Sequence, residues 1–317
     1  MRLPYGPDMA LLIYTKAHDP QEWATALKSL LPDLDIRLHP NTGNPNDIEV
    51  ALVAKPPHGL LKSFPNLRLI HTFGAGVDAV LADPHLPRHV PLARVIDDRL
   101  TVAMTEYVLL HVLRFHRQVD AMAANQRNRA WKWLPPVDAA ERVIGIMGMG
   151  TLGMAAAQKL SQFGFQLVSW SRSLKAIDGV TSFHGDDHLD SFLRLCNVLV
   201  CLLPLTPETR GIINRRTLSL LPRGAYVINA ARGGHVVEED ILHALDSEWL
   251  SGATLDVFDE EPLRDNHPFW THPKVTVTPH NAADSITAQV APQIADNIRR
   301  LRDGLPLLRL VDYKRGY

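Results

Sequence analysis

The chain alternates short apolar runs with amphipathic stretches, a pattern typical of parallel sheets covered by helices. In the first third, strand-like runs occupy residues 10–14, 50–53 and 67–70, and an amphipathic stretch covers 23–31. The alternation resumes with further strand-like runs at 142–147, 165–170, 197–203, 224–229, 252–257 and 275–277. The pattern predicts two α/β units, each with its own parallel sheet.

Two longer helix-like stretches lie outside these runs. Residues 102–115 are apolar around most of the helical circumference, which predicts a buried helix between the units. Residues 286–301 contain Pro292, which predicts a kink or a restart of that helix. This last helix would carry the chain back to the first unit, and the apolar run 305–311 would add a strand there.

The charge of the chain is nearly balanced, with 33 Lys and Arg against 34 Asp and Glu in 317 residues. This balance gives no net field that would attract nucleic acid or an anionic membrane, so a small-molecule partner is expected.

Cys196 and Cys201 fall at odd spacing in one strand-like run, which predicts core thiols on opposite faces and no metal site. Residues 1–8 lack the apolar stretch of a signal peptide, and no run could span a bilayer. A cytoplasmic protein is expected.

A glycine-rich turn joins the run at 142–147 to the helix-like stretch 154–160, and it reads Gly148-Met149-Gly150-Thr151-Leu152-Gly153. The first glycine permits a tight turn, the second lets backbone approach a pyrophosphate, and the third lets the helix pack on the strand. Free amides at the helix N-terminus would face the phosphates. The turn predicts a dinucleotide site, and a nicotinamide makes hydride transfer the first chemistry to consider.

The identity of the nucleotide depends on the end of the next strand, which reads Ser171-Arg172-Ser173. NAD enzymes commonly place an acidic residue there to bond the ribose hydroxyls. This chain has instead a guanidinium and two hydroxyls, which suit a 2′-phosphate. The segment favours NADPH, with NADH as the weaker alternative; the competing interpretation makes Arg172 a solvated residue at a strand end.

Three titratable residues follow the later strands: Arg232, Glu261 and His280. The carboxyl ends of parallel strands form one edge of a sheet, where ligands bind. An arginine can hold a carboxylate by two hydrogen bonds, a histidine can donate a proton to a forming alkoxide, and a carboxylate can orient the imidazole. Together they fit the reduction of a 2-oxo acid, whereas each alone also fits a surface or core role.

These segments, with residues 203–214 and Gly74-Ala75-Gly76-Val77, resemble the D-isomer-specific 2-hydroxyacid dehydrogenase family over nearly the whole chain. The resemblance implies two Rossmann-like domains, the cofactor domain (99–284) being inserted into a discontinuous substrate domain (1–98 and 285–317). It implies catalytic roles for Arg232, Glu261 and His280, with Gly74 to Val77 offering amides to the substrate carboxylate. It also implies cofactor contacts from Pro204, Ala230 and Asp256, and a homodimer.

Within the family, the turn at 171–173, Trp131, Trp133 and the ending 311–317 most resemble the glyoxylate and hydroxypyruvate reductase A branch. Reduction of glyoxylate to glycolate and of hydroxypyruvate to D-glycerate is therefore expected. Two departures stand out, since residues 96–99 replace a common hinge sequence and Lys55 stands where the branch tends to carry an aromatic. Lys55 is interpreted as a solvated loop residue, or as a cleft residue for a second polar substrate group.

Other polar residues are given structural roles: Asp78 as the start of a helix, and His71, His184, His188 and His243 as structural histidines. The alternatives are an NAD-dependent lactate or phosphoglycerate dehydrogenase, and a nicotinamide-sensing corepressor without turnover. A formate dehydrogenase is disfavoured because Glu261 stands where those enzymes carry glutamine.

Overall fold

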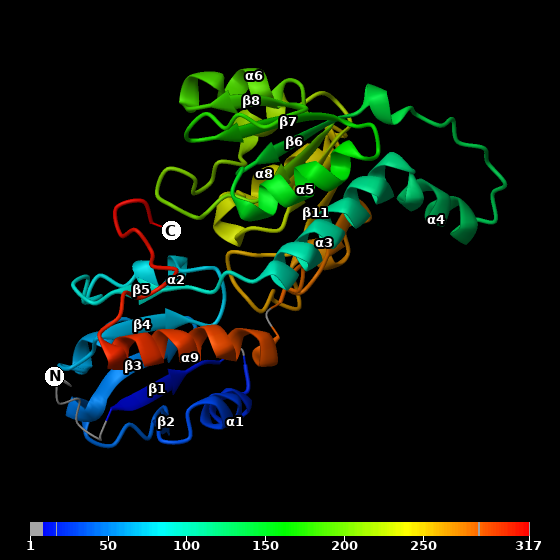
Figure 1. The fold of residues 1–317 in the computed structure, drawn as a ribbon. Helices are drawn as coiled ribbons and strands as arrows, with labels where there is room; N and C mark the ends of the chain where they lie inside the picture. Colours follow the sequence, from blue (N-terminus) through cyan, green and yellow to red (C-terminus); the bar gives the residue numbers. More distant parts are fainter. Residues whose placement is uncertain (1–8, 17, 285, 317) are drawn as a thin grey trace. The chain divides into compact units, whose positions relative to one another are not determined.

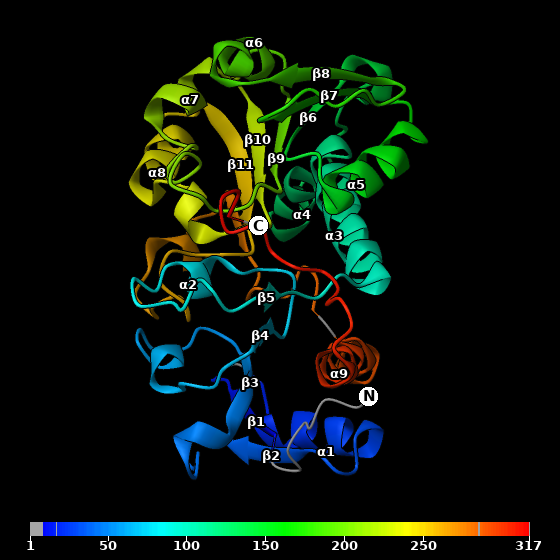
Figure 2. The ribbon, with the colours of Figure 1, turned by 60° about the vertical axis from the view of Figure 1, so that its left-hand side comes forward.

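The computed structural model describes residues 9–16, 18–284 and 286–316, which form two compact units (Figure 1, Figure 2). Unit 1 contains the chain up to Leu100 and again from Asp284, and unit 2 runs from Thr101 to Ala283. The first eight residues, for which the sequence predicts no signal peptide, lie outside the described part of the chain.

Unit 1 is a five-stranded parallel sheet in the order β2-β1-β3-β4-β5. Its strands are β1 (Ala10–Tyr14), β2 (Asp35–Leu38), β3 (Ile48–Val53), β4 (Leu69–Thr72) and β5 (Leu92–Ala93). Its helices are α1 (Pro20–Leu30), α2 (Asp78–Leu81) and α9 (Thr287–Asp303), with 3-10 turns η1 (Pro45–Asp47) and η2 (Leu61–Ser63). The sequence predicts the bounds of β1 because that strand is a fully buried apolar run.

Helix α9 runs without interruption through Pro292, so the predicted restart of the helix is wrong. Its buried side chains, among them Val290, Ile294 and Ile298, share one apolar cluster with Trp23 and Leu27 of α1 and with strand residues of the sheet. This packing offsets the hydrogen bond that the proline ring removes from the helix.

The apolar run 305–311 does not form the predicted strand. It makes an isolated antiparallel bridge between Leu310 and Ala93, supported by a 2.8 Å hydrogen bond from the amide of Val311 to the carbonyl of Leu92. Arg309 has a left-handed backbone with φ of 57°, which breaks the extended conformation that a strand needs.

Unit 2 is a seven-stranded parallel sheet in the order β12-β11-β10-β9-β6-β7-β8. Its strands are β6 (Val143–Met147), β7 (Gln166–Ser171), β8 (Val180–His184), β9 (Val198–Cys201), β10 (Ala225–Asn229), β11 (Leu250–Leu255) and β12 (Val275–Val277). The chain leaves β6 toward β7 and β8 and then returns to β9 on the other side. Such a switch point in strand order is where open α/β sheets bind ligands.

Helices cover both faces of this sheet (Figure 2). They are α3 (Asp98–His116), α4 (Val119–Arg127), α5 (Thr151–Ser161), α6 (Leu189–Leu193), α7 (Arg215–Leu220) and α8 (Glu238–Asp246). The 3-10 turns are η3 (Ala139–Glu141), η4 (Asp186–His188), η5 (Gly233–His235) and η6 (Pro268–Trp270). Residues of α3 and α5 share one apolar cluster with Ile144 and Ile146, whereas α6, α7 and α8 share another with Leu199 and Val227.

Helix α3 is buried on one side only, so the prediction of a buried helix around 102–115 is wrong. Met104, Tyr107, Val108, His111 and Val112 are buried at the spacing of one helical stripe. The side chains of Val102 and Leu110 are 55% and 60% exposed. The apolar residues encircle the helix, but the described part of unit 2 covers only one of its faces.

The two cysteines do not lie in one strand, and the predicted opposite faces are wrong. Strand β9 begins at Val198. Cys196 precedes this strand, and its amide donates a hydrogen bond to the carbonyl of Leu193. Strand alternation therefore does not apply to Cys196, and both cysteines join one apolar cluster as buried free thiols. Burial raises the pKa of the Cys196 thiol.

Candidate active site

The glycine turn between β6 and α5 has the geometry that a dinucleotide requires. Gly148 has φ of 101°, and a Cβ on Gly153 would lie 2.0 Å from the carbonyl oxygen of Gly148, so only glycine fits at both positions. A Cβ on Gly150 would meet nothing within 4 Å, which leaves open space beside the backbone. Gly150 caps α5 without a side-chain hydrogen bond, so the first amides of the helix are not capped by that residue.

The segment Ser171 to Ser173 lies at the end of β7 with Arg172 exposed. Ser171 donates from Oγ to the carbonyl of Ser173 at 2.9 Å, which closes the turn. The pKa of Glu208 is lowered by hydrogen bonds from Thr206 and from its own amide, and also by the nearby charge of Arg172. The turn after β7 and the loop after Pro204 thus lie within electrostatic reach of each other.

Arg232 follows β10 in a loop that packs against the loop of Glu261. A Cβ on Gly233 would lie 1.8 Å from the carbonyl carbon of Phe258, so the two backbones touch. Asn229 donates from Nδ2 to the carbonyl of Arg232 at 2.9 Å, and the Arg232 guanidinium donates to the carbonyl of Ala231 at 2.6 Å. The close approach brings two of the three predicted residues to one edge of the sheet.

Glu261 and His280 form a hydrogen-bonded pair. Nδ1 of His280 lies 3.0 Å and 2.9 Å from the two carboxylate oxygens of Glu261, and the amide of Phe258 donates to Oε1 of Glu261. The side chain of Glu261 is 18% exposed, whereas that of His280 is 41% exposed. Because a carboxylate only accepts, Nδ1 carries hydrogen and Nε2 is left for a ligand.

Asp256 holds the loop that carries His280. Its Oδ1 accepts from Oγ1 of Thr278 at 2.6 Å and from the amide of Asn281 at 3.0 Å, and its Oδ2 accepts from the amide of Ala282 at 3.0 Å. The amide of His280, whose φ is 54°, donates to the Asp256 carbonyl at 2.8 Å. The buried carboxylate thus fixes a left-handed turn, a contact that the sequence did not predict.

Tyr107 of α3 extends this network. Its hydroxyl lies 2.7 Å from Oγ1 of Thr278. Since the Thr278 hydrogen is directed to Asp256, Tyr107 is the donor. Burial raises the pKa of Tyr107, so the phenol keeps its proton. The sequence does not predict the contact of Tyr107 with Thr278, because the two residues are 171 positions apart and carry no motif.

The predicted substrate loop, Gly74 to Val77, belongs to unit 1, between β4 and α2. The Gly74 carbonyl accepts from Oγ1 of Thr72 at 2.7 Å and from the Val95 amide at 3.1 Å. Helix α2 begins at Asp78, as the sequence predicts. Lys55, at the end of β3, is exposed and has φ of 46°.

The histidines given structural roles lie outside these contacts. His71 is buried in β4, and burial lowers its pKa to about 4. His184 and His188 are exposed and stack with ring centroids 5.1 Å apart, and His243 is exposed on α8. No group of three or more His, Cys, Asp or Glu residues suited to a metal occurs within residues 9–16, 18–284 and 286–316.

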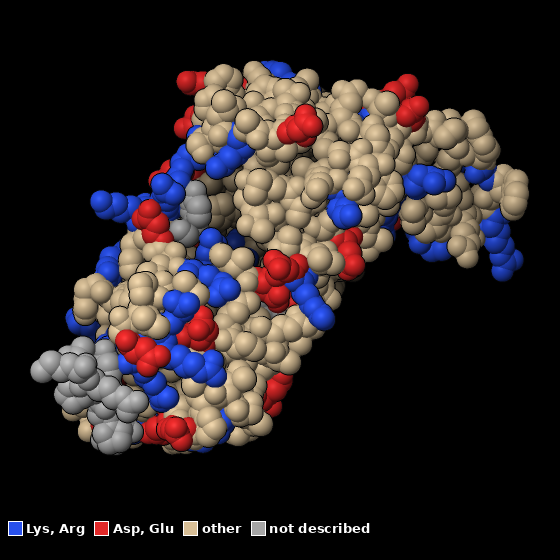
Figure 3. Space-filling view, viewed as in Figure 1, with Lys and Arg blue, Asp and Glu red and all other residues tan. Residues whose placement is uncertain are grey.

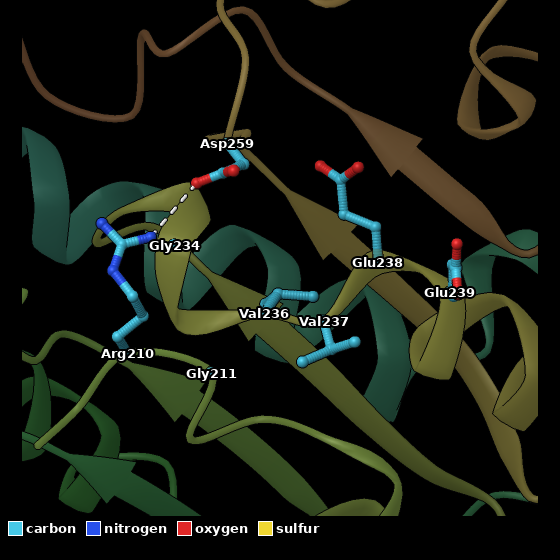
Figure 4. Close-up of a pocket in the computed structure, with 8 residues that line it drawn as sticks. All are labelled: Arg210, Gly211, Gly234, Val236, Val237, Glu238, Glu239 and Asp259. Atoms are coloured by element: carbon cyan, nitrogen blue, oxygen red, sulfur yellow. Dashed lines mark ion pairs between the residues drawn. The ribbon is translucent and has the colours of Figure 1, made fainter. Parts of the chain in front are cut away.

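One pocket of unit 2, about 370 Å³ in volume, lies beside the Arg232 and Glu261 loops but includes neither residue (Figure 4). Arg210 and Asp259 face each other there with 3.5 Å between their charged atoms. Glu238 and Glu239 also line it. Three carboxylates against one guanidinium would repel an anionic 2-oxo acid, so this pocket is not its expected site.

The visible surface carries charges of both signs. Figure 3 shows Lys and Arg interspersed with Asp and Glu on this face of each unit. Among the described helices, none has the length and apolar character needed to cross a membrane.

Comparisons with known proteins agree with this geometry. Residues 109–282 match the family model "D-isomer specific 2-hydroxyacid dehydrogenase, NAD binding domain". The chain is 41% identical over 314 residues to glyoxylate/hydroxypyruvate reductase A of Yersinia enterocolitica, covering 98% of this chain and 100% of that protein. It is 43% identical to the protein of the same name from Serratia proteamaculans over the same shares.

Solved structures give the same result. A D-isomer specific 2-hydroxyacid dehydrogenase from Xanthobacter autotrophicus, in complex with NADPH and MES, is 44% identical with a TM-score of 0.91. An NADPH-dependent glyoxylate/hydroxypyruvate reductase from Sinorhizobium meliloti, in complex with NADP and sulfate, is 40% identical with a TM-score of 0.89. Both comparisons cover 98% of this chain and 100% of the other. The chain therefore belongs to the D-isomer-specific 2-hydroxyacid dehydrogenase family.

Proposed function

We propose that the protein is an NADPH-dependent reductase of small 2-oxo acids, which converts glyoxylate to glycolate and hydroxypyruvate to D-glycerate. One observation carries the proposal: Nδ1 of His280 is held on the Glu261 carboxylate, so Nε2 is available to a ligand. The Arg232 loop packs against the Glu261 loop at the same end of the sheet. The 41% to 43% identity to reductases of this name over 98% of the chain supports the same substrates.

The cofactor is proposed to lie on the β6 turn and the end of β7. The space beside Gly150 and the N-terminus of α5 suit a pyrophosphate, and Arg172 suits a 2′-phosphate. The residues assigned to it are Gly148, Met149, Gly150, Thr151, Leu152, Gly153, Ser171, Arg172, Ser173, Pro204, Ala230 and Asp256. Bound NADPH would supply a hydride to the substrate carbonyl carbon.

The protein's own residues supply the binding and the proton. Arg232 holds the substrate carboxylate by paired hydrogen bonds. In unit 1, the amides of Gly74 to Val77 are assigned to substrate binding. His280 donates the Nε2 proton to the carbonyl oxygen as it becomes an alkoxide, and Glu261 stabilises the imidazolium before the transfer. In this assignment residues 1–98 and 285–317 form the substrate domain, and residues 99–284 form the cofactor domain.

The test is loss of NADPH absorbance with glyoxylate, hydroxypyruvate, pyruvate and phenylpyruvate, each assayed beside NADH. We expect turnover of the first two acids with NADPH. Faster turnover of pyruvate with NADH would instead identify a lactate dehydrogenase. Binding of NADPH without turnover of any acid would favour the corepressor alternative.

Arg172→Ala tests the choice of cofactor. Loss of one charged hydrogen bond to the 2′-phosphate, worth about 1.5 to 3 kcal/mol, should raise the KM for NADPH about 10-fold or more. The KM for NADH should not change, since NADH lacks that phosphate. Lys175→Ala, a nearby change of the same charge, is the control; equal losses with both cofactors would contradict the assignment.

We also infer that the protein is a cytoplasmic homodimer. The nine-residue helix α4 buries none of its side chains, and Figure 1 shows it extending away from the sheet of unit 2. So short a helix is marginal in water without packing. A second copy of the chain would cover its apolar residues and the exposed Leu110 of α3.

A further inference from the structure

His235 is fully buried at the end of η5, three residues after Arg232. Its Nδ1 lies 3.1 Å from the carbonyl oxygen of Arg232, and its Nε2 lies 3.2 Å from the carbonyl oxygen of Pro204. The two carbonyls belong to different loops, one after β10 and one after β9. A single imidazole therefore joins them.

The two contacts determine the protonation state of the ring. A carbonyl oxygen only accepts hydrogen bonds, and a neutral imidazole carries one N–H and one lone pair. In the neutral ring, one nitrogen lone pair would face a carbonyl lone pair away from water, which is costly. An imidazolium donates at both nitrogens and satisfies both carbonyls.

Other donors hold the same carbonyls in place. Thr209 donates from Oγ1 to the Pro204 carbonyl at 2.7 Å, and Asn229 donates from Nδ2 to the Arg232 carbonyl at 2.9 Å. Neither carbonyl is therefore free to turn away from the ring. The geometry around His235 is set by the loops on both sides.

The surroundings also favour a charge on the ring. Burial by itself lowers the pKa of His235, but Cys201 at the end of β9 and the two carbonyls outweigh that effect, so the pKa is raised above its ordinary value. Arg232 borders the ring through its carbonyl and directs its guanidinium to the carbonyl of Ala231. Cys201, a buried free thiol, lies beside the ring, and its sulfur acts there as a hydrogen-bond acceptor.

We propose that His235 is a positioning residue which, as an imidazolium, ties the loop of Arg232 to the loop of Pro204. The inference rests on the proposed function, in which Arg232 holds the substrate carboxylate and Pro204 borders the cofactor. The loop of Arg232 and the loop of Pro204 then keep the same positions relative to each other through the reaction. His235 touches neither ligand and acts only through the two carbonyls.

The first test reads the ring itself in the full-length protein. Long-range proton–nitrogen NMR of histidine-labelled protein at neutral pH should show both ring nitrogens of His235 protonated, the signals being assigned by their loss in His235→Gln. If that variant does not fold, Cys201→Ala assigns the His235 signals instead, because this change beside the ring shifts their resonance frequencies. A single protonated nitrogen at neutral pH would overturn the proposal, whatever reaction the protein catalyses.

The second test is kinetic. His235→Gln replaces two charged donors, so the KM for the 2-oxo acid should rise about 10-fold or more while the variant remains folded. The matched control is His243→Gln, at an exposed histidine of α8. It should leave the KM for the 2-oxo acid and the KM for NADPH unchanged. A folded His235→Gln with wild-type KM for both substrates would overturn the role of His235 and leave the proposed reductase intact. A wild-type protein without turnover would contradict the proposed function, and the NMR result would still decide the state of His235.

Discussion

His280 carries the proton in the proposed reduction, so its replacement has the most direct outcome. His280→Ala should lower kcat by about 10² to 10⁴, the usual contribution of a general acid. Glu261→Gln keeps an acceptor for Nδ1 but removes the charge that stabilises the imidazolium. Its kcat should therefore fall less than that of His280→Ala. Steady-state kinetics with glyoxylate measures both. Near-normal kcat in His280→Ala would remove the histidine from the mechanism.

His71 gives the fold a dependence on pH. Its pKa is lowered by burial to about 4 from an ordinary value of 6.5, so the unfolded chain binds the extra proton first as the pH falls. The contribution of neutral His71 to the free energy of unfolding is fully present above about pH 6.5. It is lost as the pH falls toward 4, by about 1.4 kcal/mol for each pH unit crossed. Urea unfolding at pH 7.5 and 5 measures the loss.

His71→Leu is the matching variant, because leucine cannot gain a proton in the unfolded state. It should reduce the difference in unfolding free energy between the two pH values by about 2 kcal/mol. His243→Leu, at an exposed position, should leave that difference unchanged. An equal difference in His71→Leu and wild type would assign the pH dependence to other groups.

At the scale of elements, α3 supports the His280 loop through the Tyr107 hydroxyl on Thr278. Tyr107→Phe keeps the ring against His111, whose centroid lies 4.4 Å away, and removes one hydrogen bond worth about 1 kcal/mol. The expected result is a several-fold lower kcat with a small loss of stability.

Tyr226→Phe is the matched control, since its hydroxyl makes the same kind of contact, 2.8 Å from Thr254, without reaching that loop. It should cost similar stability, read by urea unfolding, and leave kcat unchanged. Equal kcat in the two variants would contradict the support of the loop by α3.

The sequence predicts elements best where one local signal determines them. β1 and β12 are found at their predicted bounds, because each is a short run of strand-forming residues ended by polar or turn residues. The family, the α/β class and the two parallel sheets are confirmed by the comparisons. The contacts of Tyr107 and His235 were beyond prediction, because each joins residues distant in sequence through single polar atoms. The exposed side of α3 was missed because apolar composition does not tell which face a neighbour covers.

At the scale of the whole molecule, each unit has its own sheet and its own buried apolar clusters. The Glu261–His280 pair, the Arg232 loop, the glycine turn and the His235 contacts all lie in unit 2. Positions within one sheet depend on the packing of that unit alone, so the proton donor and the cofactor turn are fixed by the same core.

The proposed dimer follows from apolar surface that unit 2 leaves exposed. Leu110 of α3 is 60% exposed, Met122 of α4 is 46% exposed, and Trp131 and Trp133 follow α4 with exposed rings. Leu110→Glu would place a charge in an interface that excludes water, so it should shift the protein from dimer to monomer in light scattering after size exclusion. Leu305→Glu, at a residue of unit 1 that is 52% exposed, is the control and should remain dimeric. A monomeric wild-type protein at micromolar concentration would contradict the dimer, and the reduction of 2-oxo acids would then have to be complete within one chain.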